Sequence, residues 1–119
     1  MAYVDGFVTP VPRKKLAQYR RMAQLGAKAW KEYGALEYVE AVADDVKPGK
    51  HTSFPQSVKL KKGEVVIFSY AVYKSRKHRD RVIAKVMKDK RFEPYMDPKK
   101  LPFDGKRMFW GGFKPIVSL

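Results

Sequence analysis

The sequence predicts an α+β fold in which four antiparallel strands form one sheet and two helices pack on one of its faces. Three observations lead to this prediction. The chain has 119 residues, enough for one two-layer domain, so residues 1–119 are expected to form a single unit. Hydrophobic residues make up 45% of the total, which is enough to fill a core. The chain has no cysteine, so this core has to be stable without disulfides. Patterns of period two and period 3.6 follow one another in the order strand, helix, strand, strand, helix, strand.

The first strand is predicted over residues 3–11, where apolar side chains point to both faces and Pro10 and Pro12 end the run. A helix is predicted over residues 13–33, because its apolar residues recur at intervals of three and four. These residues are Leu16, Tyr19, Ala23, Ala27 and Trp30. Gly34 follows the last turn and is expected to end the helix in the left-handed conformation.

The second strand is predicted over residues 36–43. Alternation along a strand puts Leu36, Tyr38, Glu40 and Val42 on one face, and Ala35, Glu37, Val39 and Ala41 on the other. The connection over residues 44–63 is longer than an ordinary loop, which is typical of a functional loop or a short element. We expect a short helix at residues 55–60, capped by Ser53.

The third strand, predicted over residues 64–73, is apolar on both faces, as expected for a central strand that is covered on both sides. A second helix is predicted from Ser75, its cap, to about residue 90. Val82 and Val86 belong to its buried edge.

The last part of the chain is predicted to be an irregular segment followed by the fourth strand. Residues 92–103 contain three prolines and are expected to lie over the sheet as a lid. The strand is expected within residues 101–116, where Lys106 and Arg107 begin it. It is dense in aromatic residues and is broken by the pair Gly111-Gly112. Paired glycines in a strand indicate a bulge or a close approach by another part of the structure.

This order of elements is typical of the ferredoxin-like fold, βαββαβ, with both helices on one face of an antiparallel sheet. The helices leave the other face uncovered, although the third strand is apolar on both faces. A second copy of the chain is the simplest cover. The sequence therefore predicts a homodimer that forms through the sheet face.

The charge of the chain is its one extreme property. The formal net charge is +14, and residues 61–119 hold 16 basic residues against 6 acidic ones. Such an excess favours contact with polyanions such as RNA or DNA. The alternative is a basic surface that only keeps the protein soluble or reflects a proteome-wide bias.

Several functional classes are excluded or disfavoured. The absence of cysteine excludes a thiolate nucleophile and cysteine-based metal sites. The sequence has no signal-peptide pattern and no apolar run near the ~20 residues of a membrane span, so a cytoplasmic protein without membrane contact is expected. Neither a metal nor a cofactor is predicted, and the sequence leaves open whether the protein is an enzyme.

Several short stretches together resemble the uncharacterised bacterial family known as domain of unknown function 1428. They are Tyr3-Val4-Asp5-Gly6-Phe7, Glu40 with Asp44-Asp45-Val46, Phe54-Pro55 with Val58, Val65-Val66-Ile67-Phe68-Ser69, and Pro102-Phe103-Asp104-Gly105-Lys106-Arg107-Met108 followed by Gly111-Gly112-Phe113. The resemblance covers almost the whole chain. It implies a dimeric α/β-barrel fold and no established activity. The second helix is unusually basic for this family.

A candidate pocket for a small polar molecule is predicted between the sheet and the helices. It combines acidic residues at strand ends, basic residues near the last strand and strand aromatics. Its members are Asp5, Tyr38, Glu40, Asp44, Asp45, Tyr70, Lys106, Arg107 and Trp110. A carboxylate beside a basic group in a cleft can bind a ligand or assist proton transfer. The alternative is a set of ion pairs and turn caps, with Asp44 and Asp104 in turns.

The aromatic residues and histidines suggest further possibilities that are weaker. Phe109 and Phe113 are candidates to extend the aromatic lining of that pocket, although strand aromatics are usually core. His78 occupies the place where a haem-degrading relative is expected to hold its haem ligand, but a solvated helix histidine is favoured. His51 has no second histidine nearby, so a metal site is not predicted there.

The alternative function is polyanion binding through the second predicted helix. Its candidate residues are Arg76, Lys77, Arg79, Arg81, Lys85 and Lys88. Phosphate contacts need only proximity, and they produce a steep dependence of affinity on salt. A third alternative is an interaction protein without a ligand, since this fold hosts many unrelated activities.

Overall fold

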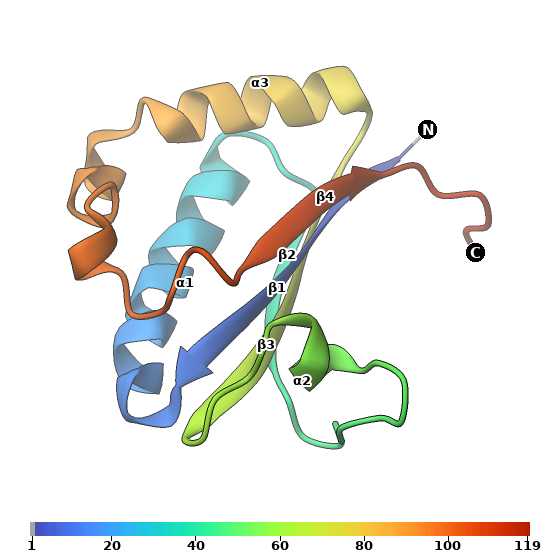
Figure 1. The fold of residues 1–119 in the computed structure, drawn as a ribbon. Coiled ribbons are helices and arrows are strands. Elements are labelled where there is room, and N and C mark those ends of the chain that lie inside the picture. Colours follow the sequence, from blue (N-terminus) through green and yellow to red (C-terminus); the bar gives the residue numbers. More distant parts are fainter. Residues whose placement is uncertain (1) are drawn as a thin grey trace.

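The computed structural model describes residues 2–119 and confirms the ferredoxin-like α+β fold (Figure 1). The four strands are β1 (Tyr3–Pro12), β2 (Glu37–Val42), β3 (Glu64–Tyr73) and β4 (Phe109–Phe113). They form one antiparallel sheet in the order β2-β3-β1-β4. This order places the two longest strands, β1 and β3, in the centre.

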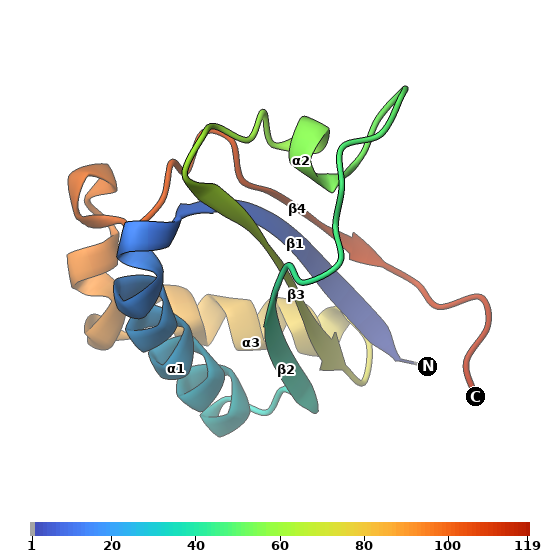
Figure 2. The same ribbon diagram turned by 90° about the horizontal axis from the view of Figure 1, so that it is seen from below.

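The helices form a single layer on one face of the sheet. This layer contains a 3₁₀ turn (Arg13–Lys15), α1 (Leu16–Glu32) and α3 (Arg76–Met87). The short helix α2 (Phe54–Ser57) lies on the opposite side, as Figure 2 shows. We call the side that faces α1 and α3 the helix face, and the other side the open face.

The predicted start and stop signals act as expected. Ser53 caps α2 by accepting a hydrogen bond from the Gln56 amide, and Ser75 caps α3 in the same way. Gly34 ends α1 with φ of 110°, a conformation that favours glycine.

The strand register decides which face each side chain takes. Val4 lies between Val72 and Phe113, and this register continues without a bulge through Gly111 and Gly112. Of the two alternatives predicted for the glycine pair, a bulge and a close approach, the structure shows the close approach: the Tyr3 side chain packs against Gly112. A Cβ atom at Gly112 would lie 2.7 Å from Cε2 of Tyr3.

The core is divided between the two faces. On the helix face, one cluster around Tyr73 and Val82 packs under α1 and α3, and a second joins Tyr19 to Ile67. On the open face, Val58 beside α2 covers Val8 and Val66. The rest of the open face has no covering element within residues 2–119, as Figure 2 illustrates.

Two predictions about the C-terminal part need correction. Residues 92–103 contain 3₁₀ turns (Lys90–Tyr95 and Pro98–Lys100) and close one end of the helix layer, where Phe92 packs against Trp30 (Figure 1). They do not form a lid over the open face. The last strand begins at Phe109, so Lys106 and Arg107 precede it in a turn that Asp104 stabilises.

No helix among the described residues is both long enough and apolar enough to cross a membrane.

Candidate functional site

Glu40 is the centre of a side-chain hydrogen-bond network on the helix face of the sheet. Its Oε1 atom accepts hydrogen bonds from the Tyr19 hydroxyl at 2.6 Å and from the Ser69 hydroxyl at 2.5 Å. Its Oε2 atom accepts one from the Tyr38 hydroxyl at 2.7 Å. A carboxylate offers about four acceptor positions, so one position, on Oε2, remains free.

Three elements bring these donors together. Glu40 and Tyr38 are two residues apart on β2 and therefore share its helix face, while Ser69 lies opposite Glu40 on β3. Tyr19 reaches the carboxylate from α1. Gly26 allows α1 to approach, because a Cβ atom there would lie only 2.8 Å from the Tyr38 hydroxyl oxygen.

The two tyrosines remain protonated hydrogen-bond donors. Burial raises the pKa of Tyr19 and of Tyr38 well above the ordinary value, and the nearby negative charge of Glu40 raises both further. Neither hydroxyl is therefore available as a base near neutral pH. The network holds a carboxylate, with hydroxyl donors that stay in place.

A pocket opens beside this carboxylate, between α1 and the edge strand β2. It encloses about 270 Å³. Its lining residues are Leu16, Tyr19, Arg20, Ala23, Glu40, Val42 and Ile67. We call it the Glu40 pocket. It combines an apolar wall, one carboxylate and one exposed guanidinium, and its size suits a small ligand.

Asp5 belongs to a separate buried network under α3. Its side chain is fully buried and its Oδ1 atom accepts a 2.7 Å hydrogen bond from Arg79, while Oδ2 has no partner. Burial raises the pKa of Asp5, although the Tyr73 hydroxyl and Arg79 oppose this shift. Arg79 also lies over the rings of Tyr3 and Trp110. The arrangement ties α3 to β1 and β4.

Arg107 belongs to a third network, which joins loops on the open-face side. Its guanidinium forms a two-pronged ion pair with Glu64 at 2.8 and 2.6 Å and donates to Asp104 at 3.0 Å. It also donates to the backbone carbonyls of Val58 and Lys59. Arg107 lowers the pKa of both carboxyl groups. The N–H groups of Arg107 thus form hydrogen bonds that connect these loops to β3.

The predicted pocket is therefore not one site. Asp5, Glu40 and Arg107 belong to three separate networks, and Asp44, Asp45 and Lys106 are exposed. The aromatic members also separate. Tyr38 and Trp110 lie on the helix face, while Tyr70, Phe109 and Phe113 lie on the open face. The sequence pattern gave the residue types, and the strand register distributes them between faces.

Sequence reasoning missed the partners of Glu40. Tyr19 is correctly placed on the inner stripe of the first helix, but its hydroxyl function was not foreseen. Ser69 carried a usable signal, because a lone hydroxyl in an apolar strand needs a hydrogen-bond partner when it is buried.

His78 has a structural position. Its Nδ1 atom accepts a 2.9 Å hydrogen bond from the Lys74 amide, and its ring meets Tyr73 edge to face. Burial lowers the pKa of His78, with Arg81 and Lys74 as further causes. His78 is a helix histidine, as expected, and lies in the first turn of α3. Its ring is half-buried against Tyr73 rather than fully solvated.

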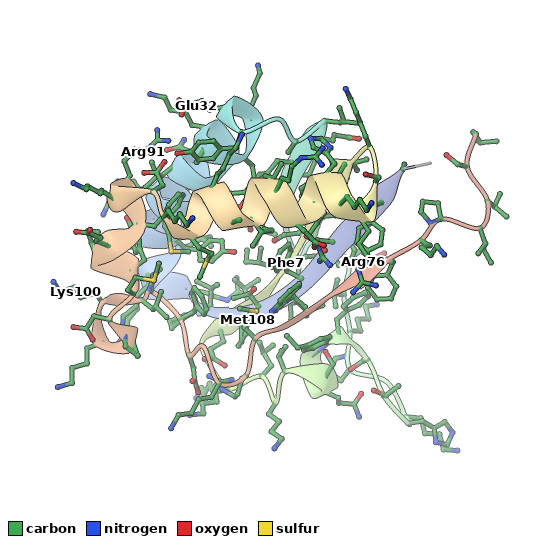
Figure 3. The ribbon with its side chains drawn as sticks, turned by 90° about the horizontal axis from the view of Figure 1, so that it is seen from above. Phe7, Glu32, Arg76, Arg91, Lys100 and Met108 are labelled. Atoms are coloured by element: carbon green, nitrogen blue, oxygen red, sulfur yellow. The ribbon has the colours of Figure 1, made fainter. Side chains whose placement is uncertain are left out.

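The basic residues of α3 form an exposed stripe, apart from Arg79. Lys77, Arg81, Lys85 and Lys88 are exposed at intervals of three and four, and none has a carboxylate partner among residues 2–119. Arg76 is exposed at the start of α3, near β4, and Figure 3 places it at the opposite end of the helix from Arg91. We call these five residues the α3 stripe. Arg79 is paired with Asp5 and Asp80 instead.

The open face carries exposed aromatic side chains. Phe68, Phe109 and Phe113 are each at least 44% exposed. They border a groove of about 470 Å³ with Val4, Gly6 and Tyr70. Among the described residues, the strand positions on this face include no lysine or arginine. The Tyr70 hydroxyl donates to Glu37 at its edge.

The described residues contain no group of three or more histidine, cysteine, aspartate or glutamate side chains that could hold a metal ion.

Comparison with known proteins identifies the family. A family model described as a protein of unknown function, DUF1428, matches residues 2–105. The chain belongs to this family. It is also similar to the uncharacterized protein YbaA of Escherichia coli K12 and to that of Shigella flexneri. Each is 46% identical over 118 residues, which covers 99% of both chains.

A solved structure with the same fold comes from an uncultured marine organism. It is a dimeric ferredoxin-like protein that aligns over 100% of both chains with a TM-score of 0.66 and 11% identity. At this identity the likeness concerns the fold. The DUF1428 chain thus has a known family and a known fold.

Proposed function

We propose that this DUF1428 protein binds a small molecule in the Glu40 pocket. The observation that carries the proposal is the convergence of three hydroxyl donors on one carboxylate at the wall of a pocket. Hydrogen-bond networks that only support a fold do not need an accessible cavity beside them. The free acceptor position of Glu40 suits an ammonium or hydroxyl group of a ligand.

The rest of the pocket restricts the ligand class. Leu16, Ala23 and Ile67 offer apolar contact for a short aliphatic or aromatic body. The proposed ligand is therefore a small amphiphilic molecule whose donor head group meets Glu40. Acid–base chemistry by the tyrosines is not part of this proposal, because their raised pKa values keep them protonated.

An NMR titration with two matched probes tests the proposal. 3-Methylbutylamine and 3-methylbutanoate share an aliphatic body and differ in the sign of their head groups. The amine is expected to shift the amide signals of Glu40, Val42 and Tyr19, and the carboxylate to shift them far less. Glu40→Gln should abolish the difference.

Glu37→Gln is the matched control, because Glu37 lies on the same strand and belongs to the open face. It should leave the response unchanged. Equal responses to both probes in the wild type, or an unchanged response in Glu40→Gln, would contradict the proposal.

We also propose that the protein is a homodimer that forms through the open face. The supporting observation is that Phe68, Phe109 and Phe113 are exposed on this face, while the strand positions there hold no basic residue within residues 2–119 although the net charge of the chain is +14. Two copies can therefore meet there without direct repulsion, and their exposed aromatic side chains gain cover. The marine protein of similar fold, described as dimeric, is consistent with this proposal.

Light scattering of a charged variant tests the dimer. Phe109→Lys places a cation on the open face and should convert the dimer to a monomer. Lys85→Glu, on the far side of the molecule, should leave the dimer intact. A wild-type monomer at concentrations of tens of micromolar would contradict the proposal.

A second candidate function is polyanion binding through the α3 stripe. This function is favoured because Lys77, Arg81 and Lys85 are exposed and, among residues 2–119, form no ion pair with a carboxylate. The triple variant with glutamate at these three positions should weaken binding to a 20-nucleotide RNA and flatten its salt dependence. Lys61, Lys99 and Lys100, changed to glutamate together, give a control with the same net charge. Equal losses in both variants would indicate attraction by net charge alone.

A further inference from the structure

The segment that follows β4, residues 114–119, is rich in apolar side chains without cover. Ile116 is 97% exposed and Val117 is 83% exposed, and Leu119 is also fully exposed. Figures 1 and 2 show this segment running away from the sheet, beyond the N-terminal end of β1. We call it the tail. Several large apolar side chains left in water on one short segment are typical of a segment that docks on a partner.

A pocket of matching chemistry lies beside β2, on the open-face side. It encloses about 240 Å³. Its lining residues are Ala41, Val42, Ala43, Asp44, Val46, Phe54, Val66 and Phe68. Asp44 is the only charged residue among them, and the rings of Phe54 and Phe68 meet edge to face with centroids 5.8 Å apart. We call it the Phe54 pocket. Val46 and Phe54 remain exposed at its rim.

The tail and the Phe54 pocket lie at diagonally opposite corners of the sheet. The strand order puts β2 at one edge and β4 at the other. The register puts Phe113, where the tail begins, at the level of Val4 and Val72. The Phe54 pocket is at the other end of the strands, at the level of Val66. A tail therefore cannot reach its own pocket without crossing the whole face.

In a two-fold symmetric dimer, each tail can reach the Phe54 pocket of the other copy. When two sheets pack face to face, a two-fold axis along the remaining diagonal places each tail corner over the partner's pocket corner. Both exchanges then form at once, as an isologous interface requires. The strands of the two sheets would cross steeply, which is one of the two usual modes of sheet packing. Six residues extend up to about 20 Å, so the tail can reach into the pocket.

The size of the open face gives an independent reason for the exchange. The strands β1 to β4 contain 10, 6, 10 and 5 residues and, at about 4.8 Å between strands and about 3.3 Å per residue, present roughly 500 Å² in projection. Stable interfaces bury about 800 Å² per partner. The exposed apolar side chains of the tail add contact area next to this face.

We propose that residues 114–119 of each copy pack into the Phe54 pocket of a second copy. This inference rests on the homodimer proposed above and adds an exchange of segments to it. Ile116 and Val117 supply the apolar side chains, and Phe54 and Val46 close over them. The partner is thus recognised by apolar contact rather than by charge.

Cross-linking of two single-cysteine chains tests the exchange. The chain has no native cysteine, so Val117→Cys and Val46→Cys each carry one thiol. Mild oxidation of a mixture should yield the mixed disulfide-linked dimer, identified by its mass. A mixture of Val117→Cys with Lys85→Cys, whose thiol lies on α3, should yield at least tenfold less. Because the two thiols start on different chains, the product reports contact between copies.

Sedimentation of charged variants provides the second measurement. Val117→Asp should raise the dimer dissociation constant at least tenfold, because its carboxylate would enter an apolar pocket. Ser118→Asp adds the same charge to the same tail and should change the constant less than threefold. Equal effects of the two variants would overturn the exchange.

The outcomes also separate this inference from the dimer itself. A dimer without the mixed disulfide would overturn the exchange and leave the open-face interface standing. A monomer in every measurement would overturn both.

Discussion

Single residues decide how this molecule uses its few buried polar groups. Glu40 is the main example, since one carboxylate satisfies three hydroxyl groups from three elements. Asp5 is the opposite case, because one of its oxygen atoms is buried without a partner. The sequence singled out both carboxylates, but it could not tell which of them is saturated with donors. That difference depends on contacts across the sheet and from the helix layer.

Removal of the Glu40 carboxylate should destabilise the fold. Glu40→Ala leaves the hydroxyls of Tyr19, Tyr38 and Ser69 without their acceptor, and an unsatisfied buried group costs about 1–3 kcal/mol. We expect a loss of roughly 2–4 kcal/mol in the free energy of unfolding by urea titration, and about 1 kcal/mol for Glu40→Gln, which keeps an acceptor. Glu37→Ala, on the open face, should stay within about 0.5 kcal/mol. Similar losses at both positions would contradict this account.

His78 should make stability depend on pH. Its pKa is lowered in the folded protein, so the folded state binds fewer protons than the unfolded state as the pH falls. Its contribution to stability is complete above the ordinary pKa of about 6.5 and is lost below it. The melting temperature should therefore fall between pH 7.5 and pH 5.5.

The comparison with His78→Gln isolates this effect. Glutamine does not titrate, and its carbonyl oxygen can accept the hydrogen bond from the Lys74 amide. The variant should lose part of the pH dependence, whereas His51→Gln, in an exposed loop, should keep all of it. An unchanged pH profile in His78→Gln would contradict the role of the ring.

At the scale of elements, local sequence signals predict where structure begins and ends. Ser53, Ser75 and Gly34 all act as their positions suggested. The order of strands and helices followed from periodicity, and β3 matches its predicted bounds. The end of the chain was less predictable, because residues 92–108 have no periodicity and are placed by contacts such as that of Phe92 with Trp30.

The cap of α3 offers a measurable case. Ser75→Ala removes the acceptor for the His78 amide and should lower the free energy of unfolding by about 1 kcal/mol. Ser53→Ala removes the equivalent bond from α2, which has only four residues, and should cost less. Chemical denaturation of both variants checks the order. A larger loss for Ser53→Ala would contradict the view that α3 carries more of the fold.

The candidate site was predictable only as a set of residue types. Alternation along β2 correctly placed Tyr38 and Glu40 on one face. The grouping with Tyr70 and Lys106 failed, because Tyr70 has the opposite parity on β3 and Lys106 lies in a turn before β4. Parity within one strand can be read from a sequence, but parity between strands depends on a register that forms only in the folded sheet.

At the scale of the whole molecule, charge is distributed unevenly. All six ion pairs among residues 2–119 use just three arginines, Arg79, Arg91 and Arg107. Most of the remaining positive charge is therefore free to repel a second copy. The strand positions of the open face add no positive charge to this repulsion, since within the described chain they hold carboxylates and apolar groups.

Salt should therefore strengthen the dimer. Each copy carries a net charge of +14, and screening shortens the range of repulsion from about 10 Å at 0.1 M to about 3 Å at 1 M. The dissociation constant should fall several-fold between 50 mM and 500 mM sodium chloride in sedimentation experiments. The RNA binding proposed for the α3 stripe should weaken over the same range. A dimer that dissociates as salt rises would contradict an apolar interface.

The lack of lysine on the open-face strands has a practical consequence for chemical labelling. Amine-reactive reagents, such as those used for reductive methylation or fluorophore attachment, can modify α3, the loops and Lys114 of the tail, whereas the strand positions of the open face offer them no lysine side chain. A heavily labelled sample of a Lys114→Arg variant should therefore still assemble, so surface labelling of that variant can follow the exchange of subunits over time.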